Sequence, residues 1–409
     1  MEGKRLIRSI RLQNLLSYGS EAEEITLEPL NVIIGRNASG KSNLVEALRL
    51  LRATPVGLSS YIREAGGISD YLWKGPNGST APIGGLDIVV DYPEGVVPLR
   101  YGLRFTKVGQ GVEVVDEWIR NERPVSSRKR SLDWFYNFHQ GEASLSLLML
   151  KEQRPGVSEG RGEQVFPKGE RAISSDESIF SQRKGDVFPE ITYLGEAFGR
   201  IRAYGELNVG LGSIAAFPQR ADLPDDFLLE DASNLGMVLD DFVQRGSAIQ
   251  RVLAEMKEVY FEAERIVTKI RGGTVQLLVK ESALMQPIPA NRLSDGTLRF
   301  LCFLTILCHP EPPPVVCLEE PEVGLHPDVI PKLAELLKDA SSRTQLIVTT
   351  HSDTLISALS DTPEATIICE RDAQGTHLRR LAPKRLKKWL EKYSLGELWR
   401  MGEIGGTRW

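Results

Sequence analysis

The sequence has few cysteines, and none lies at a spacing typical of a metal site or a disulfide framework. The chain has 409 residues and four cysteines, Cys302, Cys308, Cys317 and Cys369, all inside apolar runs. A disulfide scaffold or a zinc site needs cysteines that recur in close, regular pairs. We therefore expect four buried thiols in a reducing compartment.

Long apolar segments and an excess of positive charge are also absent. No stretch approaches the roughly 18 apolar residues that a transmembrane helix needs, and the start, MEGKRLIRSIRLQN, lacks the apolar block of a secretory signal. Lys and Arg number 50 against 55 Asp and Glu, a net charge of −5. This balance argues against a surface that is basic overall, but net charge does not exclude a local basic groove. We expect a cytoplasmic protein without a membrane segment.

The order of sequence patterns indicates an α/β protein. LNVIIG (30–35) is typical of a buried strand, and SNLVEALRLL after it has helical spacing. Period-two patterns predict antiparallel strands from about 86 to 120. From 291 onward helix and strand patterns alternate, which favours a largely parallel sheet covered by helices. The sequence therefore predicts a core domain in two parts, residues 1–120 and 291–409, with an insertion between them.

The insertion, residues 121–290, has a different composition. Its first part, to about residue 190, is rich in charge, Gly, Pro and Ser, and we expect long surface loops around a few short elements. A basic cluster at 128–130 precedes the aromatic residues 134–136; such a pair can bind nucleic acid, but a solvated loop followed by a strand is favoured. Apolar residues spaced by three and four predict two helices between 234 and 267, followed by strands.

The segment GRNASGKS (35–42) matches the pattern G-x-x-x-x-G-K-[ST] at every fixed position. Glycines let such a loop curl so that successive backbone N–H groups point at phosphate oxygens. Lys41 would reach the β- and γ-phosphates, and the Ser42 hydroxyl would ligate Mg²⁺. The predicted phosphate-binding residues are Gly35, Asn37, Ala38, Ser39, Gly40, Lys41 and Ser42.

Two adjacent carboxylates end a predicted buried strand in PVVCLEEPE. We predict that Glu319 takes the metal side, through a coordinated water, and that Glu320 activates the attacking water. The alternative is that both carboxylates belong to a solvated strand end without a ligand. The phosphate loop in the same chain disfavours this alternative. Another predicted strand, QLIVTT, ends at His351, which could donate a hydrogen bond to the γ-phosphate. His309 and His377 are expected to be structural or surface residues.

Together, several stretches resemble the ABC-type ATPase heads of the SMC, RecF and OLD classes, and most of all the compact RecF/OLD-like predicted AAA family ATPases of bacteria. GRNASGKSNLVEAL looks like their phosphate loop and includes Asn43 as a further nucleotide-binding residue. LSDGTLRF (293–300) looks like their signature motif, LEEPEVGLHP like their Walker B strand and D-loop, and TTHS like their switch-histidine motif.

The resemblance implies a P-loop NTPase fold: an ABC-ATPase-like head with a mixed sheet, an antiparallel β subdomain and an inserted helical lid. It implies ATP and Mg²⁺ as cofactors, and Ser294 and Gly296 as residues that contact the γ-phosphate held by a second copy. Ser294 also suits an ordinary helix cap. The implied assembly is a homodimer that closes around ATP.

The sequence departs from the family pattern at three points. Glu319 stands where many relatives have Asp, and His326 stands at the D-loop position that transporters fill with Asp. The third departure is the spacing, because the 278 positions from Lys41 to Glu319 leave room for a lid domain but not for long SMC arms. The 58 residues after His351 do not resemble the nuclease domain of OLD proteins, so we expect none here. Glu370 and Asp372 fit a solvated turn better than a nuclease site. Any nuclease or effector activity would then belong to a separate protein.

The expected function is an Mg²⁺-dependent ATPase that works as a molecular switch with DNA or a partner effector, in DNA repair or phage defence. One alternative is a nucleotide-gated scaffold that holds a toxin or nuclease and turns over negligibly. A transport ATPase subunit is less favoured, because the lid is large and no membrane segment is present.

Overall fold

The computed structural model describes residues 3–21, 23–75, 82–124, 134–149, 160–166, 173–205, 207, 209–210 and 212–406. They form two compact units, each assembled from separated segments of the chain. Unit 1 holds the described residues of 1–4, 202–365 and 382–403, and unit 2 holds those of 5–201, 366–381 and 404–409. These segments differ from the three parts inferred from the sequence, so the assignment of 1–120, 121–290 and 291–409 to head and lid stays a prediction.

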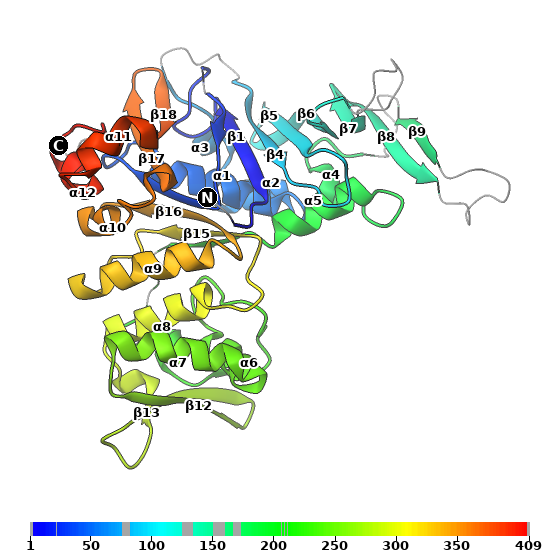
Figure 1. The fold of residues 1–409 in the computed structure, drawn as a ribbon. Coiled ribbons are helices and arrows are strands. Elements are labelled where there is room, and N and C mark those ends of the chain that lie inside the picture. Colours follow the sequence, from blue (N-terminus) through cyan, green and yellow to red (C-terminus); the bar gives the residue numbers. More distant parts are fainter. Residues whose placement is uncertain are drawn as a thin grey trace. The chain divides into compact units, whose positions relative to one another are not determined.

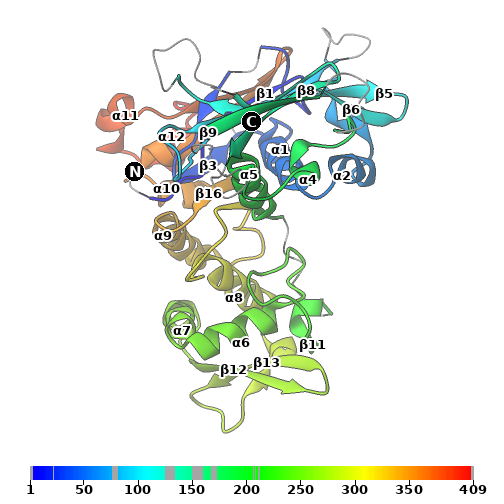
Figure 2. The same ribbon diagram turned by 90° about the vertical axis from the view of Figure 1, so that its right-hand side faces the viewer.

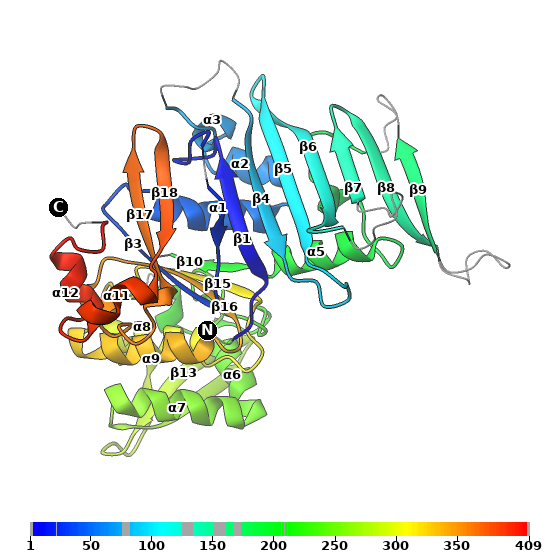
Figure 3. The ribbon, with the colours of Figure 1, turned by 45° about the horizontal axis from the view of Figure 1, so that its top comes forward.

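Unit 2 contains a long antiparallel sheet, whose strands Figure 3 shows side by side from β1 to β9. In spatial order the strands are β2 (Ile25–Thr26), β1 (Ile7–Gln13), β4 (Gly84–Val90), β5 (Leu99–Val108), β6 (Gly111–Asn121), β7 (Trp134–His139), β8 (Glu142–Met149) and β9 (Gly160–Phe166). Alternating burial along β6 agrees with its period-two sequence, because successive side chains of a strand point to opposite faces. The expected antiparallel β subdomain is therefore present.

Between 121 and 190, the sequence predicts long surface loops around a few short elements, and the described residues there include three short strands. Residues 134–139, 142–149 and 160–166 form the strands β7, β8 and β9. Polar and small residues hide the alternation there, and the strands form through ladders of backbone hydrogen bonds to their neighbours. The basic cluster at 128–130 lies outside the described residues, whereas the strand expected after it is present.

A second, shorter set of strands in unit 2 carries the phosphate loop. β3 (Leu30–Ile34) pairs in parallel with β17 (Thr366–Asp372), and β17 pairs antiparallel with β18 (Gly375–Arg380). Every residue of β3 is buried, as the continuous apolar run requires. The helices of this unit are α1 (Lys41–Ala53), α2 (Leu58–Glu64), α3 (Ile68–Tyr71), α4 (Ile179–Gln182) and α5 (Pro189–Gly199).

Unit 1 contains the second group of parallel strands. β10 (Arg202–Tyr204), β15 (Val315–Glu319) and β16 (Gln345–Thr350) pair in that order, all parallel. The α-helices that belong with them are α8 (Asp295–Leu307), α9 (Ile330–Ala340), α10 (Asp353–Ser357), α11 (Pro383–Leu390) and α12 (Leu395–Arg400) (Figure 1). The alternation of helix and strand expected after residue 291 is confirmed.

The remaining part of unit 1 is a layer of two helices on a small sheet. The helices α6 (Leu235–Arg245) and α7 (Ser247–Val259) confirm the pair expected near 234–267. They cover one face of a sheet formed by β11 (Gln219–Arg220), β13 (Thr274–Glu281), β12 (Ala263–Arg271) and β14 (Ile288–Pro289) (Figure 2). The Thr268 hydroxyl donates to an Asp240 carboxylate oxygen at 2.6 Å, which fixes the inner face of β12 against α6.

The cysteines lie in the interior of the protein. Cys302, Cys308, Cys317 and Cys369 are all buried free thiols, as expected. Within the described ranges, no helix has the length and apolarity to span a bilayer.

Candidate functional site

The phosphate-loop residues 35–40 lie between β3 and α1 in unit 2, and both fixed glycines are required by their surroundings. Gly40 has a left-handed φ of 108°, and a Cβ there would lie 2.3 Å from the Thr376 hydroxyl oxygen. A Cβ on Gly35 would lie 2.1 Å from the carbonyl oxygen of Cys369. Any side chain at either position would displace the loop from β17 and β18.

The loop is arranged to accept an anion. Lys41 is buried, and its Nζ donates to the carbonyl oxygens of Gly35 and Arg36, both at 3.0 Å, so that the ammonium group lies across the loop. The N-cap residue of α1 is Gly40, which provides no side-chain cap, and the first turn of the helix has no acidic residue. The N–H groups and positive helix end therefore suit phosphate oxygens. The Ser42 side chain is exposed next to them, where a metal could reach it.

The loop is held in place by neighbours that the sequence motif does not include. The Thr376 hydroxyl donates to the Ser39 carbonyl oxygen at 2.7 Å, and the Tyr18 hydroxyl donates to the Gly40 carbonyl oxygen at 3.2 Å. Because both side chains are buried, these contacts hold the carbonyl groups of Ser39 and Gly40 in place.

Two hollows border the loop, both inside unit 2. One of about 650 Å³ is lined by the loop residues Arg36, Asn37 and Ala38 and by residues 369–372 of β17. The other, of about 250 Å³, includes Asn43 and Trp73. Arg371 lines both: it donates to the Ala38 carbonyl oxygen at 3.4 Å, and its guanidinium lies 5.9 Å from the Trp73 ring centroid.

The paired carboxylates lie at the carboxyl end of β15 in unit 1. Glu319 is the last residue of the strand, and Glu320 follows with a left-handed φ of 46°. The Glu320 N–H donates to the Thr349 carbonyl oxygen at 2.9 Å. A left-handed conformation is costly for a residue with a Cβ, and such backbones are typical of functional sites.

The structure brings Glu320 and His351 together. The Nε2 atom of His351 lies 3.4 Å from Oε1 of Glu320, and both side chains are partly exposed. Since β15 and β16 are parallel neighbours, their carboxyl ends meet at the same edge. The two residues predicted to act on water and on the γ-phosphate are therefore adjacent.

Glu322 is a residue of this site that the sequence reasoning missed. Its Oε1 accepts from the Thr350 hydroxyl at 2.6 Å and from the His351 N–H at 2.8 Å. Its Oε2 is buried, and no hydrogen-bond partner for it occurs among the described residues. Burial raises the pKa of the Glu322 carboxyl above its ordinary value. The only sequence signal was the second glutamate of the E-P-E segment.

The signature residues begin α8. The Ser294 Oγ accepts from the Thr297 N–H at 3.1 Å, so the capping role is confirmed. Ser294 is also exposed, as contact with a second copy would require. A Cβ on Gly296 would lie 3.4 Å from the Gly324 carbonyl oxygen, so the start of α8 adjoins the turn after Glu320.

His309 and His326 have structural surroundings. The His309 ring packs against Phe227 and Phe242 at centroid distances of 5.4 and 5.2 Å, and burial lowers its pKa. His326 caps a short helical turn, because its Nδ1 accepts from the Asp328 N–H at 3.3 Å. Within the described part of the chain, no group of three or more His, Cys, Asp or Glu side chains could hold a metal by itself. A magnesium ion would therefore need oxygens from phosphate or water besides the protein groups.

Comparison with known proteins agrees with this geometry. The chain matches the family described as "AAA domain, putative AbiEii toxin, Type IV TA system" over residues 30–138 and 213–357, more than half of its length. The match includes the phosphate loop, the signature residues, Glu319, Glu320 and His351. A search of curated proteins found no significant match.

Solved structures of SMC heads share the fold. An SmcHead bound to the C-winged helix domain of ScpA has a TM-score of 0.56 at 15% identity, covering 94% of this chain and 99% of that one. A Pyrococcus furiosus Smc head with an extended coiled coil, bound to the C-terminal domain of ScpA, has a TM-score of 0.53 at 14% identity, with 95% and 99% covered. A Pyrococcus yayanosii Smc head with a coiled coil and joint has a TM-score of 0.50 at 12% identity, with 95% and 99% covered.

These likenesses show an α/β P-loop fold of the SMC and ABC ATPase-head type with mixed sheets. They do not single out the RecF/OLD-like group. By the extent of the family match, the chain belongs to the AAA-domain family described as AbiEii-like.

Proposed function

We propose that this protein is an ATP-binding and ATP-hydrolysing molecular switch that dimerises around ATP. The observation that carries the proposal is the pairing of Glu320 with His351 at the ends of two parallel strands, in a chain whose phosphate loop is shaped for an anion. The family match, to a family described as an AAA domain, supports a nucleotide as the ligand of the phosphate loop.

In the proposed reaction, the loop amides and Lys41 hold the β- and γ-phosphates. Ser42 and, through a water, Glu319 would hold Mg²⁺, which would neutralise phosphate charge. Glu320 orients and deprotonates a water whose oxygen forms a bond to the γ-phosphorus. The bond from that phosphorus to the bridging oxygen breaks, and ADP and phosphate leave. His351 donates a hydrogen bond to the transferred group, which carries negative charge.

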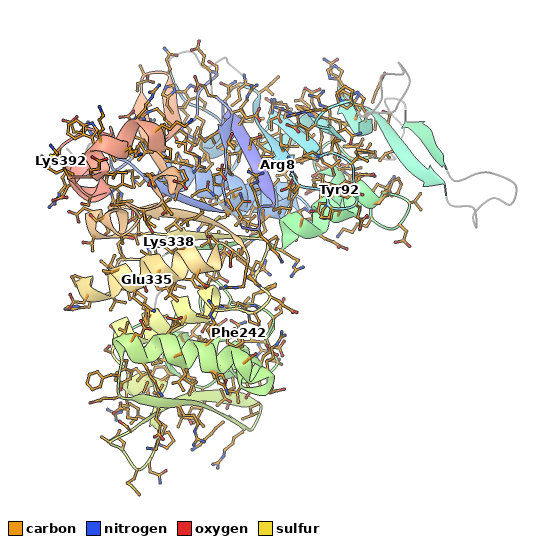
Figure 4. The ribbon with its side chains drawn as sticks, in the orientation of Figure 1. Arg8, Tyr92, Phe242, Glu335, Lys338 and Lys392 are labelled. Atoms are coloured by element: carbon orange, nitrogen blue, oxygen red, sulfur yellow. The ribbon has the colours of Figure 1, made fainter. Side chains whose placement is uncertain are left out.

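Phosphate release by Glu320→Gln tests this assignment. We expect a fall of about 100-fold or more, because a positioned base contributes about that factor, while binding of a fluorescent ATP analogue persists. Lys41→Ala should lose binding as well. The matched control is Glu335→Gln on α9, an exposed carboxylate in the same unit (Figure 4). Equal rates for Glu320→Gln and the control would remove Glu320 from its role.

We further propose that the switch acts with DNA or with a separate effector protein, in DNA repair or phage defence. The family match supports an effector role, since the description of that family includes a putative toxin of a toxin–antitoxin system. Phosphate release measured with and without DNA distinguishes a DNA-stimulated ATPase from a scaffold that binds ATP and scarcely turns over.

A further inference from the structure

The segment Pro383–Tyr393, which comprises α11 and the turn after it, is unusually basic for this acidic chain. It carries five exposed cations, Lys384, Arg385, Lys387, Lys388 and Lys392. Among the described residues, the side chains of these five make no ion pair and no hydrogen bond. Figure 4 labels Lys392 at the outer edge of this segment. We name Pro383–Tyr393 the basic–aromatic segment.

Two aromatic rings lie exposed within the same segment. Trp389 is 43% exposed and Tyr393 is 39% exposed, and their ring centroids are 6.2 Å apart. The turn holds the rings together, because the Tyr393 N–H donates to the Trp389 carbonyl oxygen at 2.9 Å. Exposed aromatic rings beside cations are the combination on which unpaired bases stack in single-strand binding proteins.

The helix sorts these side chains by face. At about 3.6 residues per turn, Arg385 and Trp389 are neighbours on one face, and Lys384 and Lys388 are neighbours on the adjoining face. Leu386 is the buried residue of α11, so the apolar side of the helix is already packed against unit 1. The outward side presents cations around an aromatic ring.

We propose that the basic–aromatic segment binds single-stranded nucleic acid. The cations contact the phosphates, and unpaired bases stack on Trp389 and Tyr393. This inference rests on the proposed function in one respect, since that function already includes nucleic acid as a partner. Binding is measured without ATP, so failure here and failure of the ATPase assignment are separate results.

Other partners fit the segment less well. A membrane surface would need an apolar helix face to bury, and that face is occupied through Leu386. Protein interfaces are depleted in lysine, whereas four of these five cations are lysines. A duplex hides the faces of its bases inside the stack, so the two rings favour unpaired strands.

Fluorescence anisotropy of labelled 20-mers tests the proposal with the full chain. We expect binding to oligo-dT and oligo-rU to be tighter than to a 20-base-pair duplex in low salt. Trp389→Ala with Tyr393→Ala should weaken single-strand binding about ten-fold or more without changing its salt dependence. The double variant Lys384→Ala with Lys388→Ala should make the plot of log association constant against log salt concentration less steep, by about 1.4 in slope.

The matched control is Arg265→Ala with Lys269→Ala on β12. These are also exposed cations of unit 1 without partners among the described residues, and they change net charge by the same amount. We expect the control to alter affinity less than about two-fold. Absence of single-strand binding, a preference for the duplex, or equal weakening by the control would overturn the proposal. Tighter binding to oligo-rU would support the proposal with RNA as the partner, and tighter binding to oligo-dT would support it with DNA.

Discussion

Glu322 links the two strand ends on which the proposed chemistry depends. One of its oxygens accepts from the Thr350 hydroxyl and from the His351 N–H, so the carboxylate ties the turn after β15 to the turn after β16. His351 and Glu320 project from these same turns. Buried hydrogen bonds of this kind restrict small displacements, and displacements near 1 Å can cost a large factor in rate.

We predict that Glu322→Ala lowers kcat for ATP hydrolysis by about 10- to 100-fold with little change in KM, because a misplaced catalytic pair affects the transition state more than binding. Glu322→Gln keeps the accepting Oε1 and should stay within about three-fold of wild type, since the hydrogen bonds persist. Steady-state phosphate release over a range of ATP concentrations measures both parameters. An alanine variant that folds normally and keeps wild-type kcat would contradict the positioning role.

Among the elements of unit 2, the buried Glu117 on β6 anchors α4. Its carboxylate accepts from the Tyr101 hydroxyl at 2.8 Å, the Ser178 hydroxyl at 2.5 Å and the Ile179 N–H at 2.9 Å. The last two belong to the start of α4, so this one side chain fastens the helix to the sheet. Burial raises the pKa of Glu117 to about 7 from an ordinary value of 4.5, even though its hydrogen bonds lower it.

The raised pKa predicts how the stability of unit 2 depends on pH. In the native state Glu117 holds its proton until about pH 7, whereas in the unfolded state it loses the proton near 4.5. The contribution is therefore fully present below pH 4.5 and is lost as pH rises through 7, a change of about 3 kcal/mol.

Urea unfolding of wild type and Glu117→Gln between pH 5 and 8 measures this contribution. The glutamine cannot ionise, and its amide can still pair with the hydroxyl groups and the Ile179 N–H. We expect the free energy of unfolding of wild type to fall relative to the variant as pH rises. A difference that stays constant across this range would show that Glu117 keeps one protonation state.

For the whole molecule, the proposed dimer requires that each ATP be held by two copies. The phosphate loop and Glu320 would serve a nucleotide within one copy, and Ser294 would serve the nucleotide of the other. Mixing two inactive variants distinguishes residues that serve the partner's site from residues that serve their own copy's site. If the two changed residues belong to different copies of one site, the mixed dimer contains one intact site.

We predict that Lys41→Ala and Ser294→Arg are each inactive alone and regain activity when mixed. Equal amounts should restore roughly a quarter of wild-type phosphate release, because half the dimers are mixed and each of these has one intact site of two. The control mixes Lys41→Ala with Glu320→Gln, whose lesions affect the same copy's site, and should restore nothing. Recovery in the control, or none in the first mixture, would contradict ATP binding across two copies.

Local patterns were sufficient for the parts of the site that are short in sequence. The phosphate loop needs six consecutive backbone positions and a following helix, and the run from Gly35 to Ser42 contains all of them. The strand ends at Glu319 and at His351 could be found in the same way, because a buried parallel strand is a continuous apolar run. Sequence therefore determined the motifs, their order and the fold class.

Contacts between distant segments were decided only by the tertiary structure. Glu322 meets Thr350 across 28 positions, Glu117 meets Ser178 across 61, and Thr376 supports the phosphate loop from 337 positions away. None of these pairs has a sequence signal, since a buried carboxylate or hydroxyl acquires its role from whichever neighbour folding brings to it. The strands β7 to β9 follow the same rule, because the hydrogen bonds that stabilise them are made to other strands and not within one stretch of chain.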